Sequence, residues 1–130
     1  MILDTSFIID IMEMDEGALS RHRTLREQNE SYRVSSATIF ELWSGVGHSR
    51  KSENEKIKVL KALSGISTIS LSLPMAEKAG EIHGILAKEG KEIDDIDAMI
   101  AATALLENET VLTRNVKHFS RVKGLRIESY

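Results

Sequence analysis

Three carboxylates in this sequence lie among apolar residues rather than on polar helical faces. Asp4 follows an apolar dipeptide, Glu41 lies within an apolar stretch, and Asp97 stands near the start of a long apolar run. A carboxylate that is partly removed from water is costly unless it is paired or binds a cation. Together with Asn115, which follows another short apolar segment, these oxygen donors favour Mg²⁺ or Mn²⁺ over zinc. An ion held in this way suits phosphoryl chemistry, including phosphodiester hydrolysis.

Each of these acids also has a purely structural explanation. Asp4 could cap the first helix, Glu41 could form a capping box with Thr38, and Asp97 could form one with Asp94. These explanations are adequate for each residue taken alone. They are weaker for the set, because carboxylates that converge at one edge of a sheet repel each other unless a cation lies between them.

Other catalytic chemistries lack the residues that they need. The chain has no cysteine, which excludes disulfides, thiolate zinc sites and a cysteine nucleophile. Its four histidines have no short metal-ligand spacing, and there is no glycine-rich phosphate loop. We expect each histidine to be a surface or core residue, and only His118 gains interest from its proximity to Asn115.

The elements that must position these residues alternate between short apolar strands and amphipathic helices. Strands are expected at 2–3, 33–35, 66–71, 110–113 and 125–127. This alternation predicts an α/β fold, a three-layer α/β/α sandwich with a central parallel sheet of about five strands. In such sheets, ligands bind beyond the carboxyl ends of the strands, where the strand order reverses.

The helices are expected to follow the caps and apolar stripes of the sequence. Thr5 or Ser6 is expected to cap the first helix, and Ser52 with Glu55 has the pattern of a capping box. Glycines at 65 and 90 are expected to end two helices, and 96–106 is expected to be a helix buried on most sides. The residues expected on the inner faces of two middle helices are Phe40, Trp43, Ile57, Leu60 and Leu63.

Length and composition bound the organisation of the chain. We expect residues 1–130 to form a single domain, because 130 residues leave no room for a second core. The formal net charge of -3 argues against a wholly basic nucleic-acid coat but permits a local basic patch. The absence of a membrane-length apolar run and of a basic signal-peptide region predicts a cytoplasmic protein with no membrane partner.

Four segments of the sequence together resemble the motifs of PIN domains. They are Ile2–Ser6; Ser36–Leu42 with Gly45; Asp97–Ala104; and Leu112–Phe119 with 122–125. Each segment alone is a weak signal, but all four occur in the order and at the spacings of the family. In size and layout the chain is most similar to the VapC toxins of VapBC toxin–antitoxin pairs.

This resemblance implies a metal-dependent endoribonuclease. Asp4, Glu41 and Asp97 match the acidic positions that hold Mg²⁺ or Mn²⁺, and Asn115 stands where many members have a fourth aspartate. Because an amide carries no charge, this departure puts a second tightly held metal in doubt. The supporting positions implied near the site are Thr5, Thr113 and Asp94, the last acting through water. The resemblance also implies a homodimer, and an antitoxin whose C-terminal segment occupies the site.

A basic stretch lies beside Asn115 in the sequence. Its cations are Arg114, Lys117, Arg121, Lys123 and Arg126. They could form a solvated surface, or they could bind the phosphates of an RNA substrate with an affinity that falls as salt rises.

Two other functions remain open from the sequence. A small phosphatase could use Asp4 as its nucleophile, but enzymes of the haloacid-dehalogenase type usually carry a second aspartate where this chain has Ser6. A degenerate, non-catalytic domain that binds RNA or a protein partner would explain Asn115. The retention of Asp4, Glu41 and Asp97 argues against it.

Overall fold

A five-stranded parallel sheet forms the centre of the molecule in a computed structural model that describes residues 1–130. Its strand order is β3-β2-β1-β4-β5. The chain adds β2 and β3 on one side of β1, and then β4 and β5 on the other side. The strand order therefore reverses between β1 and β4. The strands are β1 (Ile2–Leu3), β2 (Arg33–Ser35), β3 (Ser67–Ile69), β4 (Val111–Leu112) and β5 (Ile127–Glu128).

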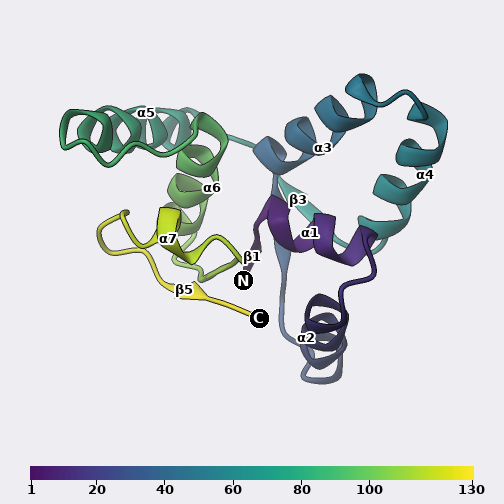
Figure 1. Cartoon of the computed structure of the whole chain (residues 1–130). Coiled ribbons are helices and arrows are strands. Elements are labelled where there is room, and N and C mark those ends of the chain that lie inside the picture. Colours follow the sequence, from purple (N-terminus) through teal and green to yellow (C-terminus); the bar gives the residue numbers. More distant parts are fainter.

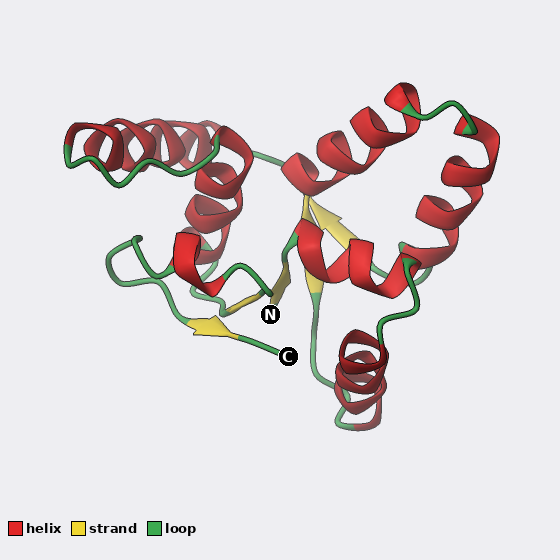
Figure 2. Cartoon of the chain, in the orientation of Figure 1, coloured by secondary structure: helices red, strands yellow, loops and turns green.

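Seven helices cover the two faces of this sheet (Figures 1 and 2). They are α1 (Thr5–Met12), α2 (Glu16–Glu27), α3 (Ser36–His48), α4 (Ser52–Ala62), α5 (Leu73–Lys88), α6 (Asp95–Leu106) and α7 (Val116–Phe119). The predicted three-layer α/β/α sandwich with five parallel strands is confirmed. No helix is both long and apolar enough to cross a lipid bilayer.

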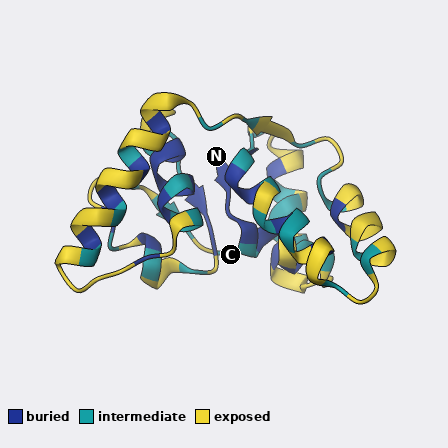
Figure 3. Cartoon of the chain, turned by 90° about the horizontal axis from the view of Figure 1, so that it is seen from above, coloured by how far each residue is buried: buried dark blue, intermediate teal, exposed yellow.

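Alternation along the strands divides the apolar residues into two cores. Ile2 and Val111 pack with α5, α6 and α7 on one face, whereas Leu3 and Leu112 pack with α1 to α4 on the other. Successive strand residues point to opposite faces, so β1 and β4 each contribute one side chain to each core. Figure 3 shows the result, with buried positions facing the sheet and exposed positions facing outward.

Helix α6 has more buried residues than any other helix. Six of its twelve residues are buried, and four of these are alanines. Small side chains allow a helix to approach its neighbours closely, and α5 packs along α6 on its outer side. The prediction of a helix buried on most sides is confirmed, and its first turn brings Asp97 to the edge where β1 and β4 end.

Three predictions about inner faces are wrong. The Phe40 side chain is 66% exposed, and Ile57 and Leu60 are 62% and 52% exposed. On α3 the buried face instead carries Thr38 and Leu42, and Phe40 lies half a turn from both. Apolar residues occur on more than one side of these helices, so hydrophobicity alone does not show which side faces the sheet.

Two predicted helix caps also differ from the structure. Asp4, rather than Thr5 or Ser6, is the N-cap of α1, and its carboxylate accepts from the Thr5 amide. The capping box of α4 does not form, because Ser52 is already the first helical residue. The helix ends near residues 65 and 90 are confirmed, and both glycines adopt positive φ. Helix α7, which the sequence did not predict, is anchored by the fully buried Phe119.

Candidate active site

Asp4 lies at the point where the strand order reverses. Its strand pairs with β4, so the residues that follow β1 and β4, Asp4 and Thr113, are neighbours. Oδ2 of Asp4 accepts hydrogen bonds from the Ser6 hydroxyl at 2.6 Å and the Thr113 hydroxyl at 2.7 Å. Oδ1 accepts from the Thr5 amide at 2.8 Å. Three donors therefore hold this carboxylate in place. Because Asp4 is only 3% exposed, these donors replace the water that would otherwise hydrogen-bond to it.

The helix-capping interpretation of Asp4 is thus confirmed, but it accounts for only one of the two oxygens. The other oxygen joins the end of β1 to the end of β4 through Thr113. Burial and fixation by three donors also leave Asp4 poorly placed to act as the nucleophile of a phosphatase.

Asp97 faces the same edge from the first turn of α6. Its carboxylate has only long contacts, 3.3 Å to Nδ1 of His118 and 3.4 Å to Nδ2 of Asn115. The pKa of Asp97 is raised from 3.8 to about 6, chiefly by burial and then by the negative charges of Asp4 and Asp94, against the lowering effect of His118. The proposed capping box with Asp94 does not form, because the Asp94 side chain makes no capping hydrogen bond. Asp97 therefore has no structural partner that requires a negative charge at this position.

Glu41 approaches from α3. Burial raises the pKa of Glu41, a hydrogen bond from Thr5 opposes this, and the charges of Asp4 and Asp94 raise it again. The capping box with Thr38 is absent, because Ser35 caps α3. Thr38 is instead fully buried. Both local explanations for the two acids on α3 and α6 therefore fail.

The four carboxylates Asp4, Glu41, Asp94 and Asp97 come from three segments, the end of β1, α3 and the start of α6. Asp4 and Asp94 raise the pKa of both Glu41 and Asp97, so these acids are close enough for their charges to oppose each other. As the side chains lie, no three histidine, aspartate or glutamate residues form a group that could hold a metal ion together. Mg²⁺, however, is commonly bound through one or two carboxylates, with water and substrate phosphates completing its shell. The donor set fits Mg²⁺ or Mn²⁺ on those terms.

Asn115 and His118 follow β4 in the chain, and both contact Asp97. The Asn115 backbone amide donates to the Thr113 hydroxyl at 2.8 Å, and its Nδ2 lies 2.8 Å from Nδ1 of His118. His118 also contacts Asp97, so it belongs to the site. His118 lies three residues after Asn115, a spacing that places two side chains on one helical face. This spacing is the feature of the sequence that indicates that His118 belongs to the site.

Ser6 is a further member of the site that the sequence analysis passed over. It donates to Asp4, lies 3.4 Å from the Thr113 hydroxyl and accepts from the backbone amide of Arg114. The sequence indicated Ser6 as a candidate helix cap and as part of the first motif, but not as a hydrogen-bond partner of Asp4. In the structure it connects α1 to the segment after β4.

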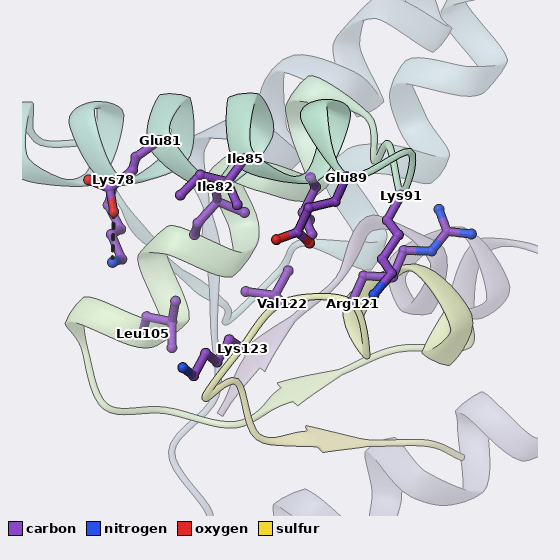
Figure 4. Close-up of a pocket in the computed structure, with 11 residues that line it drawn as sticks. Lys78, Glu81, Ile82, Ile85, Glu89, Lys91, Leu105, Arg121, Val122 and Lys123 are labelled. Atoms are coloured by element: carbon purple, nitrogen blue, oxygen red, sulfur yellow. Dashed lines mark ion pairs between the residues drawn. The ribbon is translucent and has the colours of Figure 1, made fainter.

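The basic residues near Asn115 are distributed over different surfaces. Arg114 lies beside the carboxylates and pairs with Asp10 at the far end of α1. Lys117 is exposed on α7. Arg121 and Lys123 line a groove of about 450 Å³ between α5, α6 and the loop after α7 (Figure 4). The structure therefore brings Arg114, but not the whole stretch, next to the acidic site.

Comparison with known proteins gives a consistent relationship over the whole chain. Residues 1–125 match the family model described as PIN domain. A ribonuclease VapC2 from Rickettsia felis is 30% identical over 129 residues, covering 99% of this chain and 96% of that protein. A tRNA(fMet)-specific endonuclease VapC from Shigella flexneri is 31% identical over 97 residues, covering 75% and 74%.

A solved structure agrees with these sequence relationships. The crystal structure of VapBC2 from Rickettsia felis, bound to a DNA fragment from its promoter, contains a chain that superposes with a TM-score of 0.89. That chain is 28% identical, and the match covers 99% of this chain and 97% of the other.

Proposed function

The chain belongs to the PIN domain family, and on that premise we propose that it is a metal-dependent endoribonuclease, the toxin of a VapBC-type toxin–antitoxin pair. One observation carries the proposal. At the strand-order reversal, Glu41 and Asp97 are partly buried near the negative charges of Asp4 and Asp94, and burial first, then these charges, raises the pKa of both. Such a cluster is costly to a protein that never binds a cation there.

The roles of the acids follow from their surroundings. Asp4 and Asp97 would hold Mg²⁺ or Mn²⁺ directly, and Glu41 would reach it through water. The bound ion supplies charge stabilisation for phosphodiester hydrolysis and lowers the pKa of a water molecule. The three hydrogen bonds on Asp4 keep its carboxylate in place, whereas Asp97 keeps its oxygens accessible because its contacts are long.

The proton of the attacking water passes to Glu41, whose raised pKa suits a group that must accept it. The new bond forms between the water oxygen and phosphorus, and the bond from phosphorus to the leaving oxygen breaks. Asn115 carries no charge where many members of the family have a fourth aspartate. We therefore propose a single tightly held ion, with Asn115 orienting Asp97 and His118.

The proposed partners are RNA, an antitoxin and a second copy of the chain. The names of the similar proteins support RNA, and tRNA first, as the substrate to test. The similar VapBC complex supports an antitoxin. Exposed apolar side chains such as Phe40 and Leu73, at the starts of α3 and α5, offer a surface for self-association. We also propose that the protein acts in the cytoplasm, because a ribonuclease must act where its RNA substrate is.

The test is cleavage of labelled RNA by purified protein from which any antitoxin has been removed. Labelled bulk tRNA and total RNA would be incubated with Mg²⁺, with Mn²⁺ and with chelator, and Asp97→Asn would control for contaminating nucleases. Cleavage that needs metal and is lost in Asp97→Asn would support the proposal. A folded protein that binds RNA without cleaving it, and that does not bind Mn²⁺, would instead indicate a non-catalytic PIN-like domain.

A further inference from the structure

Asp10 is a buried carboxylate that the site described above does not use. It lies on the last turn of α1 and is 5% exposed. Its Oδ1 accepts from Nη1 of Arg114 at 2.5 Å, and its Oδ2 accepts from the Tyr130 hydroxyl at 2.7 Å. An ionised carboxylate at this depth needs such partners, because removing one of them leaves an uncompensated buried charge.

Two hydrogen bonds, to Ser6 and to Asp10, hold Arg114 along α1. The Arg114 backbone amide donates to Ser6, and its guanidinium donates to Asp10. Ser6 and Asp10 are four residues apart on one helical face, which separates them by about 6 Å along the helix axis. Because Ser6 also donates to Asp4, the guanidinium lies about one helical turn from the carboxylate site.

Tyr130 fixes this arrangement from the other side. Its ring packs edge-on against the fully buried Phe7, with ring centroids 4.9 Å apart. Burial, followed by the hydrogen bond with Asp10, raises the pKa of Tyr130, so its hydroxyl remains a donor at neutral pH. The Arg114 side chain is nevertheless 63% exposed. A guanidinium has five N–H donors, so donors remain for an anion after the bond to Asp10 is made.

We propose that Arg114 binds an RNA backbone phosphate next to the scissile one, and that Asp10 and Tyr130 are positioning residues that hold its guanidinium there. The proposal rests on the proposed ribonuclease function. Arginine is well suited to this contact, because its planar fork binds phosphate through paired hydrogen bonds. Asp10 reduces the local positive charge, so its contribution is to orient the guanidinium rather than to attract RNA.

The test compares RNA binding and cleavage among three single variants, a matched control and a double variant. Affinity would be measured with fluorescently labelled bulk tRNA in an Asp97→Asn background, over a series of salt concentrations. Arg114→Ala should weaken binding about tenfold and reduce the salt slope by about one. Asp10→Asn should weaken binding about threefold, since an unanchored arginine must be ordered on binding. Tyr130→Phe should have a smaller effect in the same direction, with no change in charge.

The matched control is Glu77→Gln, an equal change of charge at an exposed residue of α5 that makes no ion pair. Attraction of RNA by net charge alone would make Asp10→Asn bind as tightly as Glu77→Gln, or more tightly than wild type, and that result overturns the proposal. The double variant Asp10→Asn/Arg114→Ala should bind no more weakly than Arg114→Ala, because Asp10 acts through Arg114.

Cleavage by these variants in an otherwise wild-type chain separates this inference from the proposed function. Asp10→Asn should raise KM more than it lowers kcat, whereas a loss of folded protein would lower the apparent kcat alone. If Asp10→Asn does not fold, Tyr130→Phe and Arg114→Ala still test the proposed role of Arg114 in binding phosphate. If wild type cleaves RNA and all of these variants behave like Glu77→Gln, only this inference fails. If wild type does not cleave RNA at all, the proposed function fails first.

Discussion

Asp97→Asn should stabilise the metal-free protein at neutral pH while abolishing its activity. The pKa of Asp97 is raised from 3.8 to about 6, chiefly by burial and then by the charge of Asp4. The folded protein therefore binds this proton more tightly than the unfolded chain does. As pH rises from about 4 to about 6, the unfolded chain releases the proton first and stability falls. An amide at position 97 carries no charge and avoids this loss.

The size of the effect follows from the shift in pKa. A rise of about two units corresponds to about 3 kcal/mol at pH values above 6. The Asp97 side chain is 13% exposed, so little of this is screened by solvent. The amide oxygen can still accept from Asn115, which keeps the shape of the site. We expect a gain of about 2–3 kcal/mol at neutral pH, or a rise in Tm of about 10 °C for a chain of this size.

Urea denaturation with chelator, at about pH 7.5 and about pH 4, measures this effect directly. The gain should be present at the higher pH and should largely disappear at the lower one. Glu77→Gln, an exposed control, should change stability by less than about 0.5 kcal/mol at either pH. Added Mn²⁺ should stabilise wild type but not Asp97→Asn. If Asp97→Asn is less stable than wild type at about pH 7.5, then the contact with His118 outweighs the cost of the buried charge and the reasoning is wrong.

Three further predictions concern the same site and the outer surface. Thr113→Val should destabilise the fold by about 1–3 kcal/mol in urea denaturation, because it removes a buried hydrogen bond to Asp4, whereas Thr113→Ser should be nearly neutral. Mn²⁺ affinity measured by calorimetry should rise as pH increases through about 6, since Asp97 must lose its proton to bind; an affinity independent of pH would contradict its role as a ligand. Phe40→Ser should change stability by less than about 0.5 kcal/mol, because the side chain is 66% exposed. In sedimentation the same variant should dissociate a dimer formed through α3, and an unchanged dimer would place the interface elsewhere.

The sheet could be predicted from the sequence because its signals are local. An apolar pair followed by Asp4 marks the end of β1, and glycines with positive φ mark two helix ends. The faces of α3 and α4 could not be predicted in the same way. Phe40 and Ile57 are as hydrophobic as the residues that are buried, and only the position of each helix on the sheet decides which side faces inward.

The acids of the site could also be predicted, because an acidic residue within an apolar segment can be recognised from the sequence alone. The residues that support them are connected over long separations. Asp10 and Arg114 are 104 positions apart, and Asp10 and Tyr130 are 120 apart. No local pattern contains such a pair. Asp10 also lies between apolar residues, Ile9 and Ile11, but that local pattern does not show which residues pair with it. Tertiary contact, rather than residue type, makes it part of the site.

Asp4 and Asp97 meet different requirements of the site: Asp4 meets a structural one and Asp97 a functional one. Asp4 receives three short hydrogen bonds, so its charge is compensated within the protein and its position is fixed. Asp97 receives only contacts of 3.3 and 3.4 Å, so its charge remains largely uncompensated. A cation between them would relieve the second carboxylate far more than the first. The free energy that Asp97 costs the folded chain is therefore recovered on binding a metal ion, which couples the stability of this edge of the sheet to its chemistry.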